Sequence, residues 1–210
     1  MIYFIGGPPR CGKTTLAKYM SKKLQIPWIS CDTLEVISGA YMTKAKWDKT
    51  HPYNRLRRIH KTNDRFYEAL STRKIVNVLR KEAHATFAAI DMMAICEIKD
   101  GNDYIVEGYH LEPRFIWTLV KKYGKKNIKA VFLTKFDAEK FAQDVHESTT
   151  PNDWLIRCTK NKETFVRVGE MVSLYSFTFE KEAKKYGFQT MCMDQDFTKQ
   201  MSKAIIILTR

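Results

Sequence analysis

Residues 6–15 read GGPPRCGKTT, which fits the phosphate-binding pattern G-x-x-x-x-G-K-[ST]. This pattern requires a strand before it and a helix after it. The apolar run 2–5 predicts the strand, and apolar residues at helical spacing follow the motif. Backbone amides at the start of a helix point partial positive charge at phosphate oxygens. The sequence therefore predicts a nucleotide-phosphate site in this loop.

The residue types of the motif suggest a role for each side chain. The Lys13 ammonium can reach the β and γ phosphates of a nucleotide, and the Thr14 hydroxyl can hold Mg²⁺. The two prolines stiffen the loop. The residues expected to contact the nucleotide are Gly7, Pro8, Pro9, Arg10, Cys11, Gly12, Lys13, Thr14 and Thr15.

Two residues inside the motif leave alternatives open. Arg10 reaches a phosphate or an acidic neighbour, or it is simply a solvated charge of the loop. Cys11 lies near the electropositive start of the helix, a position that favours a reactive thiolate. A small residue tolerated in the loop is the simpler interpretation of Cys11.

The composition is that of one globular unit. A chain of 210 residues with 44% hydrophobic content can bury one substantial core, so we expect a single domain with an insertion. No apolar run reaches membrane-spanning length, and the first strand begins directly at the N-terminus. We therefore expect a cytoplasmic protein. Its five cysteines lack zinc-like spacing, which favours reduced thiols.

The chain alternates predicted strands and helices. Five short apolar strands are expected at 2–5, 28–31, 104–107, 128–133 and 188–193. Helices are expected between them, with an irregular basic stretch at about 39–62 and a polar segment at 147–163. This alternation predicts an α/β fold, a parallel sheet with helices on both faces. Ligands of such sheets bind beyond the carboxyl ends of the strands.

Two carboxylates follow predicted strands at that edge. Asp32 could accept the proton of an acceptor hydroxyl or orient a Mg²⁺-bound water, and it could equally cap the next helix. Glu107 stands where a second Mg²⁺-organising acid is expected, although Asp is usual there, and it could act through a water. Tyr109 and His110 follow it as candidate acceptor contacts, with ordinary packing at the rim as the alternative.

The insertion at about 39–62 is strongly basic. Lys44 to Arg65 holds eight Lys or Arg residues against two Asp. A solvated surface is the usual meaning of such a run, but aromatic residues interleave here. We expect a flap over an anionic acceptor, because guanidinium pairs with phosphate or carboxylate in two hydrogen bonds. The candidate residues are Arg55, Arg57 and Arg58.

The polar segment 147–163 is expected to form a lid. Arg157, and Arg167 just beyond the segment, could close over the transferring phosphoryl group and spread its charge. The alternative is a surface helical hairpin. TKFD at 134–137 resembles the guanine-reading motif of GTPases, but EGYH stands where a GTPase has its Asp-x-x-Gly turn. Capping of a helix by Asp137 explains that match more simply.

Together, GGPPRCGKTT, ISCDTL and IVEGYHLEP resemble the small P-loop kinases. The nucleoside monophosphate kinase and shikimate kinase group is most similar, and EGYHLEP looks like 2-phosphoglycerate kinase relatives. The resemblance implies a three-layer fold with strand order 2-3-1-4-5 and ATP on the phosphate loop. It also implies an acceptor-side acid at Asp32 and a lid arginine at Arg157 or Arg167. Adenine would contact the loop from Asp194 to Phe197.

These observations predict an ATP- and Mg²⁺-dependent phosphotransferase acting on a small anionic acceptor, a nucleotide or a phosphorylated metabolite. The net charge of +13 leaves a second hypothesis, a polynucleotide or RNA-end kinase. A third is a switch or binding module that hydrolyses nucleotide without phosphorylating anything. No membrane partner is expected, and the sequence does not indicate an oligomeric state.

Overall fold

The computed structural model describes residues 1–148 and 153–209. Its strands are β1 (Ile2–Gly6), β2 (Trp28–Ser30), β3 (Tyr104–Gly108), β4 (Ile128–Thr134) and β5 (Gln189–Cys192). Its helices are α1 (Lys13–Leu24), α2 (Cys31–Gly39), α3 (Lys44–Thr50), α4 (Pro52–His60), α5 (Asn63–Ala69), α6 (Thr72–Lys99), α7 (Pro113–Tyr123), α8 (Ala138–His146), α9 (Trp154–Arg157), α10 (Lys162–Tyr186) and α11 (Phe197–Thr209).

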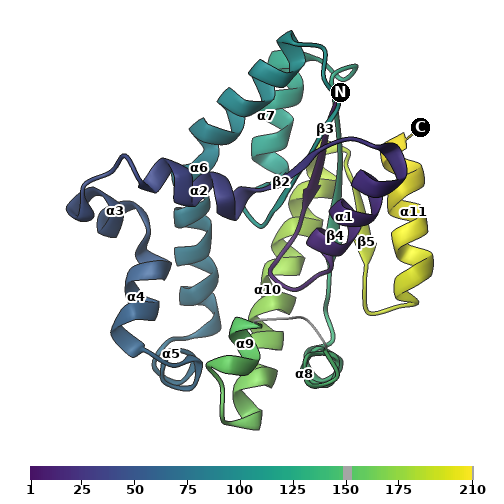
Figure 1. Ribbon diagram of the computed structural model, residues 1–210. Helices are drawn as coiled ribbons and strands as arrows, with labels where there is room; N and C mark the ends of the chain where they lie inside the picture. The colour runs from purple at the N-terminus through teal and green to yellow at the C-terminus, as the bar shows by residue number, and fades with distance from the viewer. Residues whose placement is uncertain (149–152, 210) are drawn as a thin grey trace.

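The five strands form one parallel sheet in the order β2-β3-β1-β4-β5. Helices α1 and α11 pack on one face, and α6, α7 and α10 pack on the other (Figure 1). The predicted α/β class, the helices on both faces and the strand order are confirmed. The three central strands, β1, β3 and β4, are mostly buried on both faces, which is why they read as continuous apolar runs rather than as alternating patterns.

The register of the sheet brings three strand ends together. Ile5 of β1 pairs with Glu107 of β3, and Ser30 of β2 pairs with the same glutamate. The loop after β1, the start of α2 and the turn after β3 therefore leave the sheet side by side. Site residues that are far apart in the sequence become neighbours at this edge.

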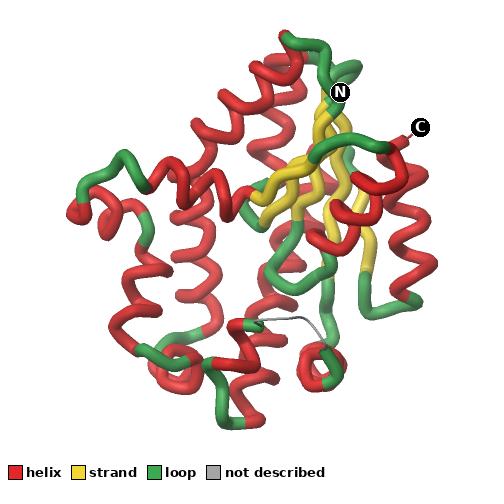
Figure 2. Tube along the Cα trace, in the orientation of Figure 1, coloured by secondary structure: helices red, strands yellow, loops and turns green. Residues whose placement is uncertain are grey.

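The prediction of an irregular stretch at 39–62 is wrong, because α3 and α4 occupy most of it (Figure 2). The Thr43 hydroxyl caps α3, and Pro52 stands in the first turn of α4, where its missing N–H is harmless. The Glu82 carboxylate of α6 accepts hydrogen bonds from the backbone amides of Tyr53 and Asn54. This contact fixes the start of α4 on α6.

The 28-residue helix α6 is the support for this part of the molecule. Helices α2 and α4 pack along it, forming a lobe beside the sheet (Figure 1). The Arg80 guanidinium of α6 pairs with Glu112 before α7 and with Glu182 on α10, at 2.6 and 2.8 Å. The lobe is thus anchored to the helices under the sheet. None of the helices described has the length and apolarity that crossing a membrane requires.

Candidate active site

The phosphate loop connects β1 to α1 and has the conformation that its glycines allow. Gly7 has a φ of 134°, and a Cβ there would lie 2.1 Å from the Leu133 carbonyl oxygen. Gly12, with a φ of 88°, precedes the first residue of α1. Lys13 is buried, and its Nζ donates to the Pro8 carbonyl at 2.6 Å, across the loop. The ammonium is therefore held over the loop where a phosphate would lie.

Two cavities border this loop, one on each side. The α8-side cavity, of about 650 Å³, lies between the loop, α8 and the chain after β5. The α2-side cavity, of about 390 Å³, lies between the loop, α2, α4 and α6. Arg10, Lys13 and Thr14 line both cavities. The loop is thus the wall that the two spaces share.

The α8-side cavity is basic and has an aromatic edge. Lys135 and Lys140 line it and both pair with Asp144, at 2.6 and 3.1 Å. The Phe197 ring, 41% exposed, lies over Gly12 and borders the cavity. The structure brings Phe197 beside Gly12 of the phosphate loop, and its predicted contact with adenine stays a prediction.

Asp194 has a different environment from Phe197. One of its carboxylate oxygens accepts from the backbone amides of Phe136 and Asp137, at 2.5 and 3.3 Å. It does not line the α8-side cavity. The structure therefore places Asp194 as a brace between the chain segments that follow β4 and β5.

The predicted pair for Mg²⁺ is assembled at the loop. The Thr14 hydroxyl donates to Glu107 Oε1 at 3.0 Å. Burial raises the pKa of the Glu107 carboxyl, while the Lys13 charge and the Thr14 hydrogen bond oppose that rise. A hydroxyl and a carboxylate are the hard oxygen ligands that Mg²⁺ prefers, so these residues fit the ion.

Carboxylates line the wall of the α2-side cavity, and a buried imidazole lies behind them. The side chain of Asp32 is 70% exposed and lines the cavity. The prediction that Asp32 caps α2 is wrong, because the Ser30 hydroxyl is the cap and accepts from the Asp32 amide. Tyr109 also lines the cavity, whereas His110 is fully buried behind it. Burial lowers the pKa of His110 to about 4, which keeps its imidazole neutral.

Of the three flap arginines, only Arg57 reaches the α2-side cavity. Its guanidinium lies 4.7 Å from the centre of the Trp154 ring and bonds Asn63 Oδ1. Arg55 and Arg58 are exposed, and Arg58 pairs with Asp48 on the surface. Helical geometry explains the difference, because Arg55 and Arg58 are three positions apart and share the exposed face of α4, whereas Arg57 points to another side.

The segment after α8 meets both the loop and the flap. Arg10 Nη1 lies 2.7 Å from Asp153 Oδ2, so Arg10 pairs with an acidic neighbour here, and a contact with phosphate stays a prediction. Asn63 Nδ2 donates to Thr159 Oγ1 at 2.8 Å, tying α5 to the chain after α9. The flap at about 39–62 and the polar segment 147–163 were predicted separately, and the structure brings them into contact. Residues 149–152 of the predicted lid lie outside the described residues.

The structure does not bring the two lid arginines to the loop. Arg157 is exposed on α9 and lines neither cavity. Arg167 Nη1 donates to the Tyr67 carbonyl at 3.2 Å, below the flap. Arg10 is the arginine that the structure holds beside Lys13.

Two local interpretations are also decided. Burial raises the pKa of the Cys11 thiol to about 12, so the hypothesis of a reactive thiolate is wrong. Asp137 caps α8, accepting from the Lys140 amide at 2.9 Å, as the simpler explanation of TKFD predicted.

The sequence analysis did not identify several residues that line the cavities. They are Tyr53, Asn54, Glu35, Glu82 and Trp154 on the α2 side, and Lys135, Lys140 and Asp144 on the α8 side. Glu35 carried a usable signal, since it stands one helical turn after Asp32. Burial raises its carboxyl pKa to about 7.

Comparisons with known proteins add evidence on the fold. No family model matches the chain, and no curated protein matches it. A gluconokinase structure from Sinorhizobium meliloti 1021 aligns over 100% of this chain and 91% of its own, at 14% identity and a TM-score of 0.56. The fold is that of the small P-loop kinases. A structure of an uncharacterized protein from Eubacterium ventriosum ATCC 27560 aligns over 99% of this chain and 97% of its own, at 13% identity and a TM-score of 0.51. The resemblance is confirmed for the fold.

Proposed function

We propose that the protein is an ATP- and Mg²⁺-dependent kinase that phosphorylates a hydroxyl group of a small acceptor. The observation that carries the proposal is the shared wall of the two cavities, Arg10, Lys13 and Thr14. A triphosphate in the α8-side cavity would present its terminal phosphate at this wall. An acceptor in the α2-side cavity would approach the same wall from the other side, as direct transfer requires.

The loop and its neighbours would bind and neutralise the triphosphate. Lys13 would exchange its bond to the Pro8 carbonyl for phosphate oxygens, and the loop amides would bind the remaining charge. Thr14 and Glu107 are the residues that would hold Mg²⁺. The ion would supply further charge neutralisation of the phosphates when bound. Phe197 would contact the adenine base.

Asp32 would serve the acceptor. The acceptor oxygen forms a bond to the γ phosphorus as the bond to the bridging oxygen breaks, and ADP leaves. The hydroxyl proton passes to the Asp32 carboxylate, which is exposed to the α2-side cavity. The transition state is loose, so positioning and charge neutralisation contribute most of the acceleration.

The walls favour an acceptor rich in hydroxyl groups. Asp32 and Glu35 line the α2-side cavity as hydrogen-bond acceptors, and Arg57 is the flap guanidinium available to an anionic group. Of the three flap arginines, Arg57 is thus the one that would bind an anionic group of the acceptor. At 14% identity, the gluconokinase resemblance supports the fold and does not select an acceptor.

An acceptor screen tests the proposal. ADP formation from ATP and Mg²⁺ is measured with polyols, sugars, sugar acids, nucleosides and their phosphates, and with a short 5′-hydroxyl RNA. At least one small acceptor should raise ADP formation well above the rate in water, with a phosphorylated product seen by mass spectrometry. Stimulation by the RNA alone would favour the polynucleotide kinase. A screen in which nothing stimulates would reject the kinase and leave a nucleotide-hydrolysing switch.

A further inference from the structure

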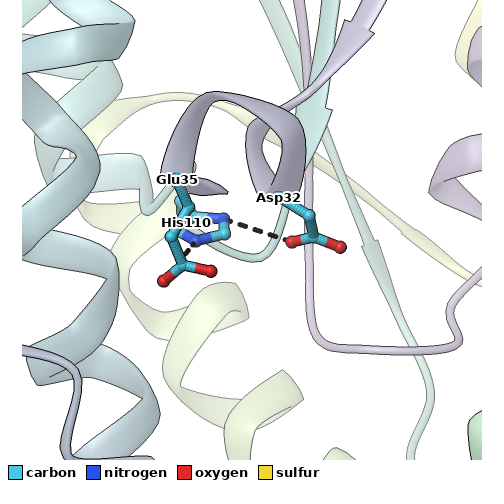
Figure 3. Close-up of side chains that lie close together, drawn as sticks. All are labelled: Asp32, Glu35 and His110. Atoms are coloured by element: carbon cyan, nitrogen blue, oxygen red, sulfur yellow. Dashed lines mark ion pairs between the residues drawn. The ribbon is translucent and has the colours of Figure 1, made fainter. Parts of the chain in front are cut away.

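Three side chains converge beside the α2-side cavity from two elements. Asp32 and Glu35 come from α2, and His110 comes from the turn after β3 (Figure 3). The imidazole lies between the two carboxylates. His110 Nδ1 is 3.8 Å from Asp32 Oδ1, and His110 Nε2 is 3.7 Å from Glu35 Oε1. These distances exceed those of hydrogen bonds.

The buried atoms of this cluster lack hydrogen-bond partners. His110 is fully buried, and neither of its ring nitrogens has a hydrogen-bond partner among the described residues. The same holds for Oε1 of Glu35, whose side chain is 9% exposed. Because Nδ1 faces Asp32 and Nε2 faces Glu35, a ring nitrogen without a hydrogen presents its lone pair to a carboxylate oxygen. Such an arrangement is unfavourable unless a cation lies between the atoms.

His51 adds a second lone pair to the same oxygen. Its Nδ1 lies 2.8 Å from the Thr50 hydroxyl and 3.2 Å from the Trp47 carbonyl. The Thr50 hydroxyl donates to the Lys46 carbonyl at 2.9 Å, and the Trp47 carbonyl can only accept, so a proton on Nδ1 satisfies both contacts. Its Nε2 then faces Glu35 Oε1 at 3.5 Å without a hydrogen. His51 is also fully buried. Glu35 Oε1 is therefore close to two imidazole nitrogens and bonded to neither.

We infer that Asp32, Glu35 and His110 bind a divalent transition-metal ion such as Zn²⁺, Mn²⁺ or Co²⁺. One ligand atom from each residue lies within 4.8 Å of the others, so one imidazole nitrogen and one oxygen of each carboxylate can face a single ion. Two carboxylates and an imidazole suit these ions better than Mg²⁺, which prefers oxygen ligands alone. His51 would support the site by orienting Glu35. This site is distinct from the Thr14 and Glu107 pair.

The ion would also define the acceptor, a consequence that rests on the proposed kinase function. Three protein ligands leave coordination positions open, and Asp32 and Glu35 line the α2-side cavity. An acceptor with two adjacent oxygen donors, vicinal hydroxyls or a hydroxy acid, would fill them. One oxygen of Asp32 would contact the ion, and the other would remain for the reacting hydroxyl.

Cobalt binding without nucleotide tests the metal site. The protein is stripped with a chelator and titrated with CoCl₂, and the visible absorption of bound Co²⁺ is recorded. The wild type should show a saturable change at one ion per chain, reversed by ZnCl₂. Glu35→Gln and His110→Ala should each weaken binding by about 100-fold or more, since even outer-shell losses cost 10–100-fold. Thermal unfolding of each variant identifies failures of folding.

His84→Ala is the matched control. His84 Nε2 lies 3.6 Å from a buried glutamate, Glu112, but among the described residues it pairs with no second carboxylate. This variant should bind Co²⁺ as the wild type does. The metal site is overturned if the wild type shows no saturable binding, which would leave a proton as the cation of the cluster. It is also overturned if folded Glu35→Gln and His110→Ala bind normally. Metal binding in a protein that phosphorylates nothing would retain the site and reject only the kinase.

Discussion

The two cavities beside the phosphate loop differ in charge. Among the described residues, four basic and two acidic side chains line the α8 side, whereas three basic and four acidic ones line the α2 side. A space with an excess of positive charge suits a triphosphate, and one richer in carboxyl groups suits hydroxyl groups or a cation. A strongly basic chain can therefore hold a pocket rich in carboxyl groups. The net charge of +13 describes the surface and gives little information about the acceptor.

The largest effect is expected at the shared wall. Lys13→Ala should lower acceptor-dependent ADP formation by about 10³-fold, because one preorganised charge at a developing anion contributes this much. Lys18→Ala, on the exposed surface of α1, is the matched control and should leave the rate unchanged. If Lys13→Ala keeps more than a tenth of the wild-type rate, the loop does not work as we describe.

Arg57→Ala should affect the α2 side alone. The KM for an anionic acceptor should rise by about 10- to 100-fold, the value of a hydrogen bond to a charged group. The KM for ATP should stay the same, since Arg57 does not line the α8-side cavity. Steady-state kinetics with each substrate varied give both numbers. Arg58→Ala, which removes a surface partner of Asp48, should change neither. Equal increases in both KM values would mean that the cavities do not act separately.

Phe197→Ala should affect the α8 side alone. Loss of the ring beside Gly12 should weaken ATP binding by about tenfold, the worth of part of a buried aromatic surface. Calorimetric titration with a non-hydrolysable ATP analogue measures it. Asp194→Asn is the contrasting variant, because its carboxylate braces the Phe136 and Asp137 amides. It should lower the unfolding temperature more than the affinity. If Asp194→Asn lowered the affinity for ATP and Phe197→Ala lowered mainly the unfolding temperature, Asp194 would be the nucleotide contact and Phe197 the structural residue.

The smallest effect concerns stability and pH. Burial, with the nearby Glu35 charge, raises the pKa of Glu82 from its ordinary 4.5 to about 8. Between these values the unfolded chain loses the proton first, so the free energy of unfolding should fall as pH rises from 5 to 8. Glu82→Gln should flatten this fall, because the glutamine has no proton to lose in this pH range. Urea unfolding at several pH values with chelator present measures it. An unchanged slope in the variant would mean that Glu82 ionises at its ordinary pKa.

The nucleotide-binding half of the candidate site was predictable because its residues are contiguous in the sequence. Gly7 to Thr15 follow a strand and open a helix, so local pattern alone indicates the loop and its position in the fold. The sheet was equally predictable, since apolar strands alternating with helices allow few arrangements. The roles of these loop residues remain predictions.

The acceptor half of the candidate site depends on contacts between segments that are distant in the sequence. Glu35 and His110 are 75 positions apart and meet only because β2 and β3 are adjacent. Arg167 looked suitable for a lid because of its charge, yet its position on α10 directs it to Tyr67. The basic stretch at 39–62 looked irregular because its helices bury little apolar surface of their own. Their stability comes from α6, which the local sequence does not reveal.

If the phosphate loop joins a nucleotide cavity to an acceptor cavity, a change on the acceptor side should leave nucleotide binding intact. Asp32→Asn is such a change. ADP formation is measured with and without the acceptor found by the screen, in the wild type and in this variant. The acceptor-stimulated rate of Asp32→Asn should be about 10²-fold lower than that of the wild type, because a general base contributes about this much. Its affinity for ATP should be unchanged. An Asp32→Asn enzyme with near-normal acceptor-stimulated turnover would contradict this proposal.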